Sequence, residues 1–139
     1  MESNVDGYDE AVALPSDPAH AFVFQDQLLA RLQSLGYTHE ALHGVRLALE
    51  EALVNAIKHG NQMDQAKRVH VRYRLGANSF AIEIRDEGPG FDPEDVPDPT
   101  APENLERPCG RGLLLMRHYM TECEFLPPGN VCRMRRVRD

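Results

Sequence analysis

The strongest constraint in the sequence is the segment Leu47–Asn61, LALEEALVNAIKHGN, whose apolar residues recur at helical spacing. One face of this helix must be buried, and it consists of Ala41 or Leu42, Val45, Leu49, Ala52, Leu53 and Ala56. A second stripe carries Glu51, Asn55 and Lys58, at steps of four and three residues. Apolar residues flank this stripe on both sides, so its carboxylate and carboxamide lose hydration that a bound partner would replace. We therefore expect the stripe to line a pocket.

The remaining side of the same helix is expected to face solvent. It carries His43, Arg46, Glu50 and Asn61, with Ile57 as its one apolar residue. Glu50 is a second candidate for an acidic functional residue, but only Glu51 lies four residues before Asn55. We choose Glu51.

Length and composition limit the classes of protein to consider. The 139 residues can bury a core without metal or disulfide staples, so we expect one domain over 11–139 after a flexible N-terminus at 1–10. The net charge of −7 argues against general binding to nucleic acid or to anionic membranes. No apolar run approaches the roughly 18 residues of a membrane span, and no signal peptide is recognisable, which predicts a cytoplasmic location.

The three cysteines show no C-x-x-C spacing, so the sequence indicates neither a zinc site nor a disulfide framework. Reduced thiols are the expected state in a cytosolic setting. Cys123 and Cys132 could nevertheless face each other across a hairpin.

Capping and turn residues predict the other helices. Ser16 or Asp17 can cap a first helix that ends near Gly36. Its apolar face would consist of Phe22, Leu28, Leu29 and Leu32. Thr38 can cap the second helix, which Gly60 and Asn61 end.

Alternating apolar residues predict the strands. A short strand is expected at Ala11–Leu14, and two antiparallel strands should flank the turn at 76–78, with Val69, Val71, Tyr73, Phe80, Ile82 and Ile84 on one face. A final hairpin is expected from Thr121–Leu126 and Val131–Val137. Its arginines, at 133, 135, 136 and 138, predict a solvated strand face rather than a binding patch.

The first hairpin leads into Asp86-Glu87-Gly88-Pro89-Gly90-Phe91. A carboxylate at the end of a buried strand can accept a hydrogen bond from the amino group of a planar base. Gly88 and Gly90 would let the backbone approach a ligand closely. The motif is equally compatible with a plain turn, because Asp, Gly and Pro are ordinary turn residues.

The next segment, 92–108, contains five prolines and many acidic residues, which predicts a mobile loop. We expect a lid over about residues 92–109. The loop ends at Gly110-Arg111-Gly112, directly before an apolar helical run at Leu113–Met120. Glycines that open a helix expose backbone N–H groups that suit a phosphate.

Together, Glu51-x-x-x-Asn55, Asp86-x-Gly88-x-Gly90 and Gly110-x-Gly112 occur in an order that resembles the GHKL ATP-binding fold of gyrase B, Hsp90, MutL and histidine kinases. The segments EEALVNAIKHGN and RDEGPGF look most like the anti-sigma-factor serine kinases. The resemblance covers roughly Leu14 to Val137. It implies an α+β fold, a two-layer sandwich in which a mostly antiparallel sheet is covered by helices on one face.

The resemblance also implies roles for individual residues. Glu51 would be the general base and Asn55 the Mg²⁺ ligand, while Asp86 would bind the adenine amino group of ATP. Gly88 and Gly90 would shape the base and sugar site. The phosphates would be contacted by Gly110, Gly112 and Lys58, and by Arg107 at the end of the lid; Arg111 is an alternative to Arg107.

By the same resemblance the protein would transfer the ATP γ-phosphate to a serine or threonine of a small antagonist-type protein and would sequester a sigma factor or another regulator. The sequence leaves open an ATP hydrolase, a non-catalytic ATP-dependent switch and a homodimer. Histidine kinase activity is disfavoured, because no dimerisation helix with a phosphoacceptor histidine precedes the motifs.

Overall fold

The computed structural model describes residues 8–88, 108–126 and 130–138, with side chains omitted at 108–113. The elements are β1 (Glu10–Pro15), α1 (Pro18–Ser34), α2 (His39–Val54), η1 (Asn55–Gly60), β2 (Arg68–Leu75), β3 (Ser79–Arg85), α3 (Pro108–Tyr119), β4 (Glu122–Leu126) and β5 (Val131–Val137). Most of the expected flexible N-terminus and of the expected lid lies outside the described residues.

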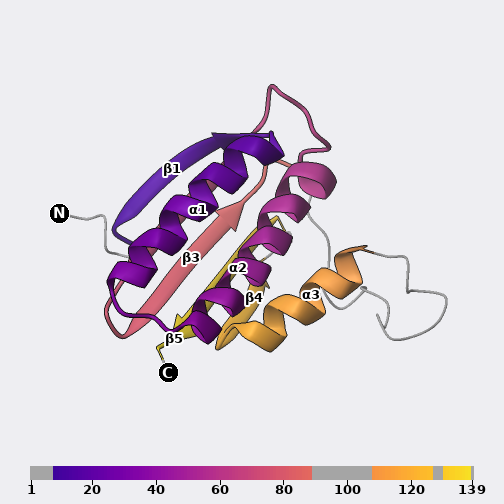
Figure 1. Ribbon diagram of the computed structural model, residues 1–139. Helices are drawn as coiled ribbons and strands as arrows, with labels where there is room; N and C mark the ends of the chain where they lie inside the picture. The colour runs from indigo at the N-terminus through magenta and orange to yellow at the C-terminus, as the bar shows by residue number, and fades with distance from the viewer. Residues whose placement is uncertain (1–7, 89–107, 127–129, 139) are drawn as a thin grey trace.

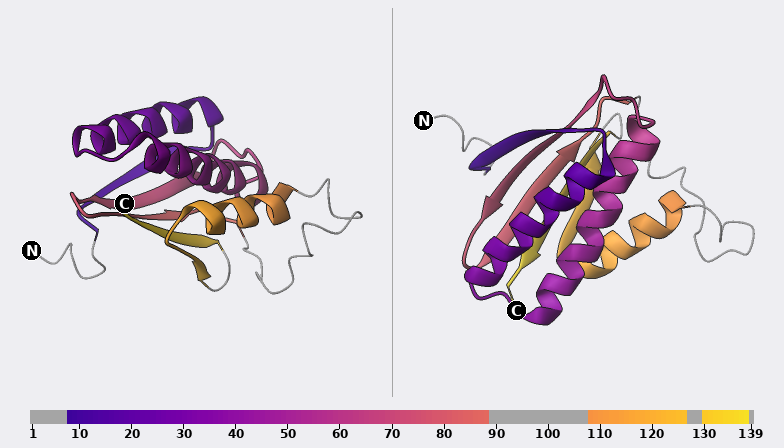
Figure 2. Two further views of the ribbon diagram at one scale, coloured as in Figure 1. Left: turned by 60° about the horizontal axis from the view of Figure 1, so that its bottom comes forward. Right: turned by 45° about the horizontal axis from the view of Figure 1, so that its top comes forward.

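The five strands form one antiparallel sheet in the order β1-β2-β3-β5-β4. Helices α1 and α2 cover one face of this sheet, and α3 lies beside α2 (Figures 1 and 2). The opposite face carries none of the described helices (Figure 2, left). The prediction of a two-layer α+β fold with a mostly antiparallel sheet is therefore confirmed.

The core lies between the two layers and follows from the periodicity of the sequence. Alternate residues of β2 and β3 turn toward the helices and are buried: Val69, Val71, Tyr73, Phe80, Ile82 and Ile84. The predicted apolar face of α2 is also buried, with Leu42 at its margin. In α1 the prediction for Phe22 was wrong, because this side chain is 39% exposed while Ala21, Phe24 and Gln25 point inward.

The caps of both long helices are as predicted. The Asp17 carboxylate accepts a hydrogen bond from the Ala19 N–H at 3.0 Å, and the Thr38 hydroxyl accepts one from the Ala41 N–H at 3.1 Å. Each cap satisfies a backbone donor that has no partner within its helix. Gly36, with φ of +93°, provides the left-handed residue that lets the chain leave α1.

The second helix continues to Gly60 as predicted, but its last six residues, η1, form a π-helix. Here the Asn61 N–H donates to the Ala56 carbonyl, five residues back, at 2.8 Å. The wider turn changes the direction of the side chains that follow it. For this reason our prediction that Ile57 and Asn61 face solvent was wrong: both are fully buried.

Asn61 joins three parts of the fold. Its amide nitrogen donates to the Ser16 hydroxyl at 2.9 Å and to the Arg68 carbonyl at 3.0 Å, and its amide oxygen accepts from the Glu87 N–H at 2.7 Å. The Ser16 hydroxyl in turn donates to the Lys67 carbonyl at 2.7 Å. One buried side chain thus holds the end of η1 against both the β1–α1 junction and the turn after β3.

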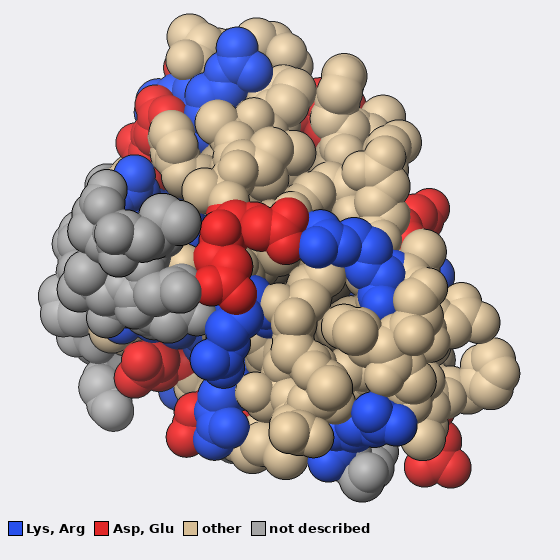
Figure 3. All heavy atoms as spheres, turned by 90° about the vertical axis from the view of Figure 1, so that its left-hand side faces the viewer, with Lys and Arg blue, Asp and Glu red and all other residues tan. Residues whose placement is uncertain are grey.

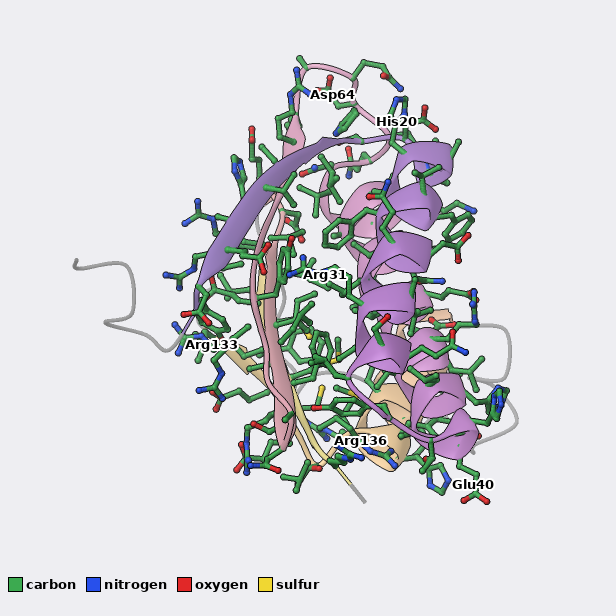
Figure 4. The ribbon with its side chains drawn as sticks, turned by 60° about the vertical axis from the view of Figure 1, so that its left-hand side comes forward. His20, Arg31, Glu40, Asp64, Arg133 and Arg136 are labelled. Carbon is green, nitrogen blue, oxygen red and sulfur yellow. The ribbon has the colours of Figure 1, made fainter. Side chains whose placement is uncertain are left out.

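Charged side chains join the layers at the edges of the sandwich. On the side that carries β1, acidic and basic side chains adjoin (Figure 3). Arg31 of α1 makes two hydrogen bonds to the Glu10 carboxylate of β1, at 3.0 and 2.7 Å. The prediction that the arginines of the last hairpin form a solvated strand face was wrong for Arg136. This side chain lies between the sheet and the helices and donates a hydrogen bond to the Tyr119 carbonyl (Figure 4).

Cys123 and Cys132 are free thiols on the helix-facing side of the last hairpin. They are diagonal neighbours, since Cys123 pairs with Met134 and Cys132 with Phe125. A hydrogen bond between the thiols lowers the pKa of Cys123 and, together with burial, raises the pKa of Cys132. In the part of the chain that the structure describes, no helix has the length and apolarity to cross a membrane.

Replacement of Asn61 by alanine should destabilise the fold, because three polar groups, one buried and two partly buried, lose their partner. We expect the free energy of unfolding to fall by about 2–4 kcal/mol in urea denaturation. The matched control is Asn78→Ala at an exposed hairpin position, where the change should stay within about 0.5 kcal/mol. Equal stability of the two variants would show that Asn61 does not hold the junction.

Candidate functional site

Glu51 lies on α2 in a half-buried position. Burial raises the pKa of its carboxyl group, the neighbouring charge of Glu50 raises it further, and His59 opposes the shift. Glu50 itself accepts a hydrogen bond from Gln25 at 3.2 Å, so it is tied to α1. Among the described residues Glu51 has no such bond, which favours it over Glu50 as the reactive carboxylate.

Asn55 is the first residue of η1, one helical turn after Glu51. Its side chain is half-buried and makes no hydrogen bond to any other described residue. The oxygen of a carboxamide in this position is available to a ligand. Lys58, one turn further along, is exposed, and π-helical segments such as η1 are frequent at functional sites.

Asp86 directly follows β3, where its side chain is partly buried. Its backbone is held by Asn130: the Asp86 N–H donates to the Asn130 carbonyl, and the Asn130 amide donates to the Asp86 carbonyl, both at 3.0 Å. Burial raises the pKa of the Asp86 carboxyl group. A hydrogen bond of 2.7 Å from the Gly88 N–H and the charge of Lys67 oppose this shift.

Gly60 and Gly88 are required by close packing around this carboxylate. A Cβ atom on Gly60 would lie 2.2 Å from the Asp86 carboxylate, and one on Gly88 would lie 2.1 Å from the Gly60 carbonyl oxygen. A real Cβ atom cannot come this close. The end of η1, which begins at Asn55, therefore lies directly against Asp86, and the first two sequence motifs meet.

The third motif is displaced from its predicted position. We expected Gly110 and Gly112 to precede the helix, but α3 already begins at Pro108. Proline suits the first position of a helix, because the N–H group that it lacks would have no partner within the helix. The side chain of Arg111 is not described, and Gly90 and Arg107 lie outside the described residues.

Helix α3 approaches α2 most closely at its carboxyl end. A Cβ atom on Gly44 would lie 3.0 Å from the Tyr119 ring. From this contact the two helices diverge toward η1 and toward the amino end of α3 (Figures 1 and 2). The glycines of α3 thus belong to the end of the helix that is nearer to the expected lid.

Three residues that build the site were not among those predicted from the sequence. Gly60 was interpreted as a helix stop and Asn61 as solvated, and Asn130 falls in the connection of the predicted final hairpin, to which we assigned no role. The signal for Gly60 and Asn61 was present in part, since they directly follow the polar stripe. Their contacts with Asp86 and Glu87 depend on residues more than 20 positions away and have no local sequence signature.

The fold and these motifs define a class of nucleotide-binding proteins. A family model described as the histidine kinase-like ATPase domain matches residues 14–136, and the chain belongs to this family.

Among its relatives are proteins named serine-protein kinase RsbW. The one from Oceanobacillus iheyensis is 25% identical over 118 residues, which cover 81% of this chain and 75% of that protein. The one from Bacillus subtilis is 26% identical over 128 residues, which cover 88% and 79%. The solved structure of the RsbU and RsbW domains of Rv1364c from Mycobacterium tuberculosis matches with a TM-score of 0.62 and 16% identity. That match covers 93% of this chain and 31% of the other, and it supports the fold.

Replacement of Asp86 by asparagine should weaken ATP binding by about 1–3 kcal/mol, because a charged hydrogen-bond acceptor is lost while the Gly88 N–H keeps an acceptor. Isothermal titration calorimetry with Mg²⁺-ATP measures this difference. Asp64→Asn is the control, since Asp64 is exposed in a turn and should leave the affinity unchanged. Equal affinities for the two variants would contradict a role of Asp86 in base binding.

Replacement of Glu51 by glutamine should stabilise the protein at neutral pH. Burial raises the pKa of Glu51 in the folded state above its value in the unfolded chain. The free energy of unfolding therefore falls as the pH rises from the pKa of the unfolded chain through that of the folded protein. At about pH 8 we expect the melting temperature of the variant to lie about 1–4 °C above that of wild type. At about pH 4 the two proteins should have the same melting temperature. The exposed Glu124→Gln should show no gain. A gain that persists at the acidic pH would contradict the explanation by charge burial.

Proposed function

We propose that this protein is a serine/threonine protein kinase of the anti-sigma-factor type, which transfers the γ-phosphate of ATP to a small antagonist-type protein and sequesters a sigma factor. The observation that carries the proposal is that Glu51, a partly desolvated carboxylate, lies one helical turn before Asn55. The carboxamide of Asn55 makes no hydrogen bond to another described residue. The relatives named serine-protein kinase RsbW support this class of reaction.

Asp86 is proposed to bind the adenine. A carboxylate accepts hydrogen bonds and donates none, so it selects the exocyclic amino group of the base. Its partial burial strengthens the interaction, because water competes less for the carboxylate. Gly60 and Gly88 keep side chains away from this carboxylate, which leaves the base room to reach it.

The residues present fit a magnesium ion. Mg²⁺ prefers hard oxygen ligands and keeps several waters, so one or two protein ligands together with phosphate oxygens suffice. Within the described residues there is no group of three or more His, Cys, Asp or Glu side chains that could hold a metal by itself. Asn55, with no hydrogen bond to another described residue, would be the protein ligand, and bound Mg²⁺ would neutralise charge on the phosphates.

Glu51 is proposed to orient the attacking hydroxyl group and to accept its proton. The hydroxyl oxygen then forms the new bond to the γ-phosphorus as the bond to the ADP oxygen breaks. A raised pKa makes Glu51 a stronger base than an ordinary surface glutamate. Lys58 and either Arg107 or Arg111 would place positive charge near the phosphates, beside the backbone N–H groups at Gly110 and Gly112.

Replacement of Glu51 by glutamine tests this proposal. With radiolabelled ATP and a cognate antagonist-type protein, label should move to a serine or threonine of the substrate. The variant keeps the shape of the side chain but not its basicity, so transfer should fall by about 10²-fold or more while ATP affinity is largely retained. Glu50→Gln is the matched control and should keep transfer within a few-fold of wild type, because Glu50 is tied to α1.

Replacement of Asn55 by alanine should have a different effect in the same assay. Mg²⁺-dependent ATP binding and transfer should both be lost, because the proposed metal ligand is removed. Unchanged transfer by Glu51→Gln would refute the assignment of the base. Release of inorganic phosphate without a labelled protein would favour an ATP hydrolase, and tight ATP and partner binding without either product would favour a non-catalytic switch.

A further inference from the structure

The sheet face opposite the helices carries an excess of positive charge. Strand alternation directs six arginines and three glutamates to this face: Arg68, Arg72, Arg74, Arg85, Arg133, Arg135, Glu83, Glu122 and Glu124. Arg133 points away from the helical layer in Figure 4. The chain as a whole carries a net charge of −7, so the excess of positive charge is a property of this sheet face and not of the protein in general.

In one row of residues across this face, the charged side chains form ion pairs with one another. Arg72, Glu83 and Arg133 lie side by side on β2, β3 and β5. Arg72 donates two hydrogen bonds to the Glu83 carboxylate, at 2.9 and 2.8 Å, and Arg133 donates a third at 2.9 Å. Glu83 is buried beneath the two guanidinium groups, and they lower the pKa of its carboxyl group against the opposing effect of burial.

The neighbouring row repeats this arrangement without the carboxylate. Arg74, Ala81 and Arg135 lie on the same three strands in the same register, so alanine stands where the first row has glutamate. The Nε atom of Arg74 is buried and has no hydrogen-bond partner. A buried donor without an acceptor is costly, which indicates that an acceptor belongs at this position.

The surface is hollowed at this row. A cavity of about 680 Å³ is lined in part by Tyr8, Arg74, Ala81, Glu122, Arg133 and Arg135. Arg135 donates to the Glu122 carboxylate at 2.8 Å, but Glu122 is 65% exposed, so this pair lies at the rim of the hollow. The hollow continues past Arg117 and Met120 of α3, and beside Ala81, whose side chain is small, it leaves space for a side chain that another molecule supplies.

We propose that this hollow binds the carboxylate of an aspartate or glutamate side chain from an acidic partner protein. The carboxylate occupies the position over Ala81 and accepts hydrogen bonds from Arg74 and Arg135, as Glu83 does from Arg72 and Arg133. Paired guanidinium groups suit a planar carboxylate with two acceptor oxygens. The net positive charge of the surrounding sheet face favours a partner whose surface is acidic.

Replacement of Ala81 by glutamate tests the site within the chain itself. The new carboxylate should pair with both arginines and raise the melting temperature by about 2–5 °C at low salt. In an Arg74→Gln background the gain from the same replacement should be at most half as large. If Ala81→Glu lowers the melting temperature by the same amount in both backgrounds, the proposal is overturned.

Binding of a partner carboxylate is tested with a fluorescent hexaglutamate peptide in anisotropy titrations. Wild type should bind the peptide, and both Arg74→Gln and Ala81→Glu should weaken binding at least about tenfold. Arg46→Gln is the control, because Arg46 is an exposed arginine on α2 and should leave the affinity unchanged. Because Arg74 is only partly buried, Arg74→Gln keeps the test valid if Ala81→Glu fails to fold.

Two further probes distinguish the occupant. Glutarate should compete with the peptide only at much higher concentration, because it supplies the carboxylates without neighbouring contacts. Glutarate that binds as tightly as the peptide would reduce the hollow to a small-anion site. An oligothymidylate that binds more tightly than the peptide, with the same dependence on Arg74, would show a nucleic-acid surface, and either result would overturn the proposed protein partner.

Discussion

The contact between the end of η1 and the turn after β3 is the constraint on which the rest of the structure depends. Gly60 lies against the Asp86 carboxylate, and the next residue, Asn61, binds the Glu87 backbone. Together they hold the helix that carries Glu51 and Asn55 at a fixed distance from the residue proposed to bind the base. The fully buried Asn61 stabilises this junction, because its three hydrogen bonds connect segments that are distant in the sequence.

The same junction explains why two carboxyl groups in the site are poorly solvated. Burial raises the pKa of both Glu51 and Asp86, and in neither case does a salt bridge among the described residues compensate. Glu83 provides the contrast, because two arginines hold its pKa below the ordinary value although it is more deeply buried than Glu51 and Asp86. The structural carboxylate of Glu83 is paired with arginines, whereas the two carboxylates proposed to act on ligands are not. That difference is the expected signature of a functional site.

The two faces of the sheet serve separate purposes. The inner face is apolar and holds the helices that form the site, while the outer face carries a ladder of arginines and glutamates. Cross-strand pairing explains most of that ladder in structural terms. Among the residues that the structure describes, the row at Ala81 is the one that leaves a buried guanidinium nitrogen without an acceptor. The binding surface proposed there is therefore separate from the nucleotide site and can be tested independently.

The sequence by itself determined the elements, their caps, the apolar faces of α2 and of the first hairpin, and the three motifs with their order. These features depend on local periodicity and on the chemistry of single residues, which a sequence displays directly. Only the tertiary structure decided that Asn61 and Ile57 are buried, that Phe22 is exposed and that Gly60 abuts Asp86. The first of these depends on the π-helical turn, and the last on a contact between residues 26 positions apart. Helical periodicity assumes a regular α-helix, so it fails where the hydrogen-bonding pattern changes.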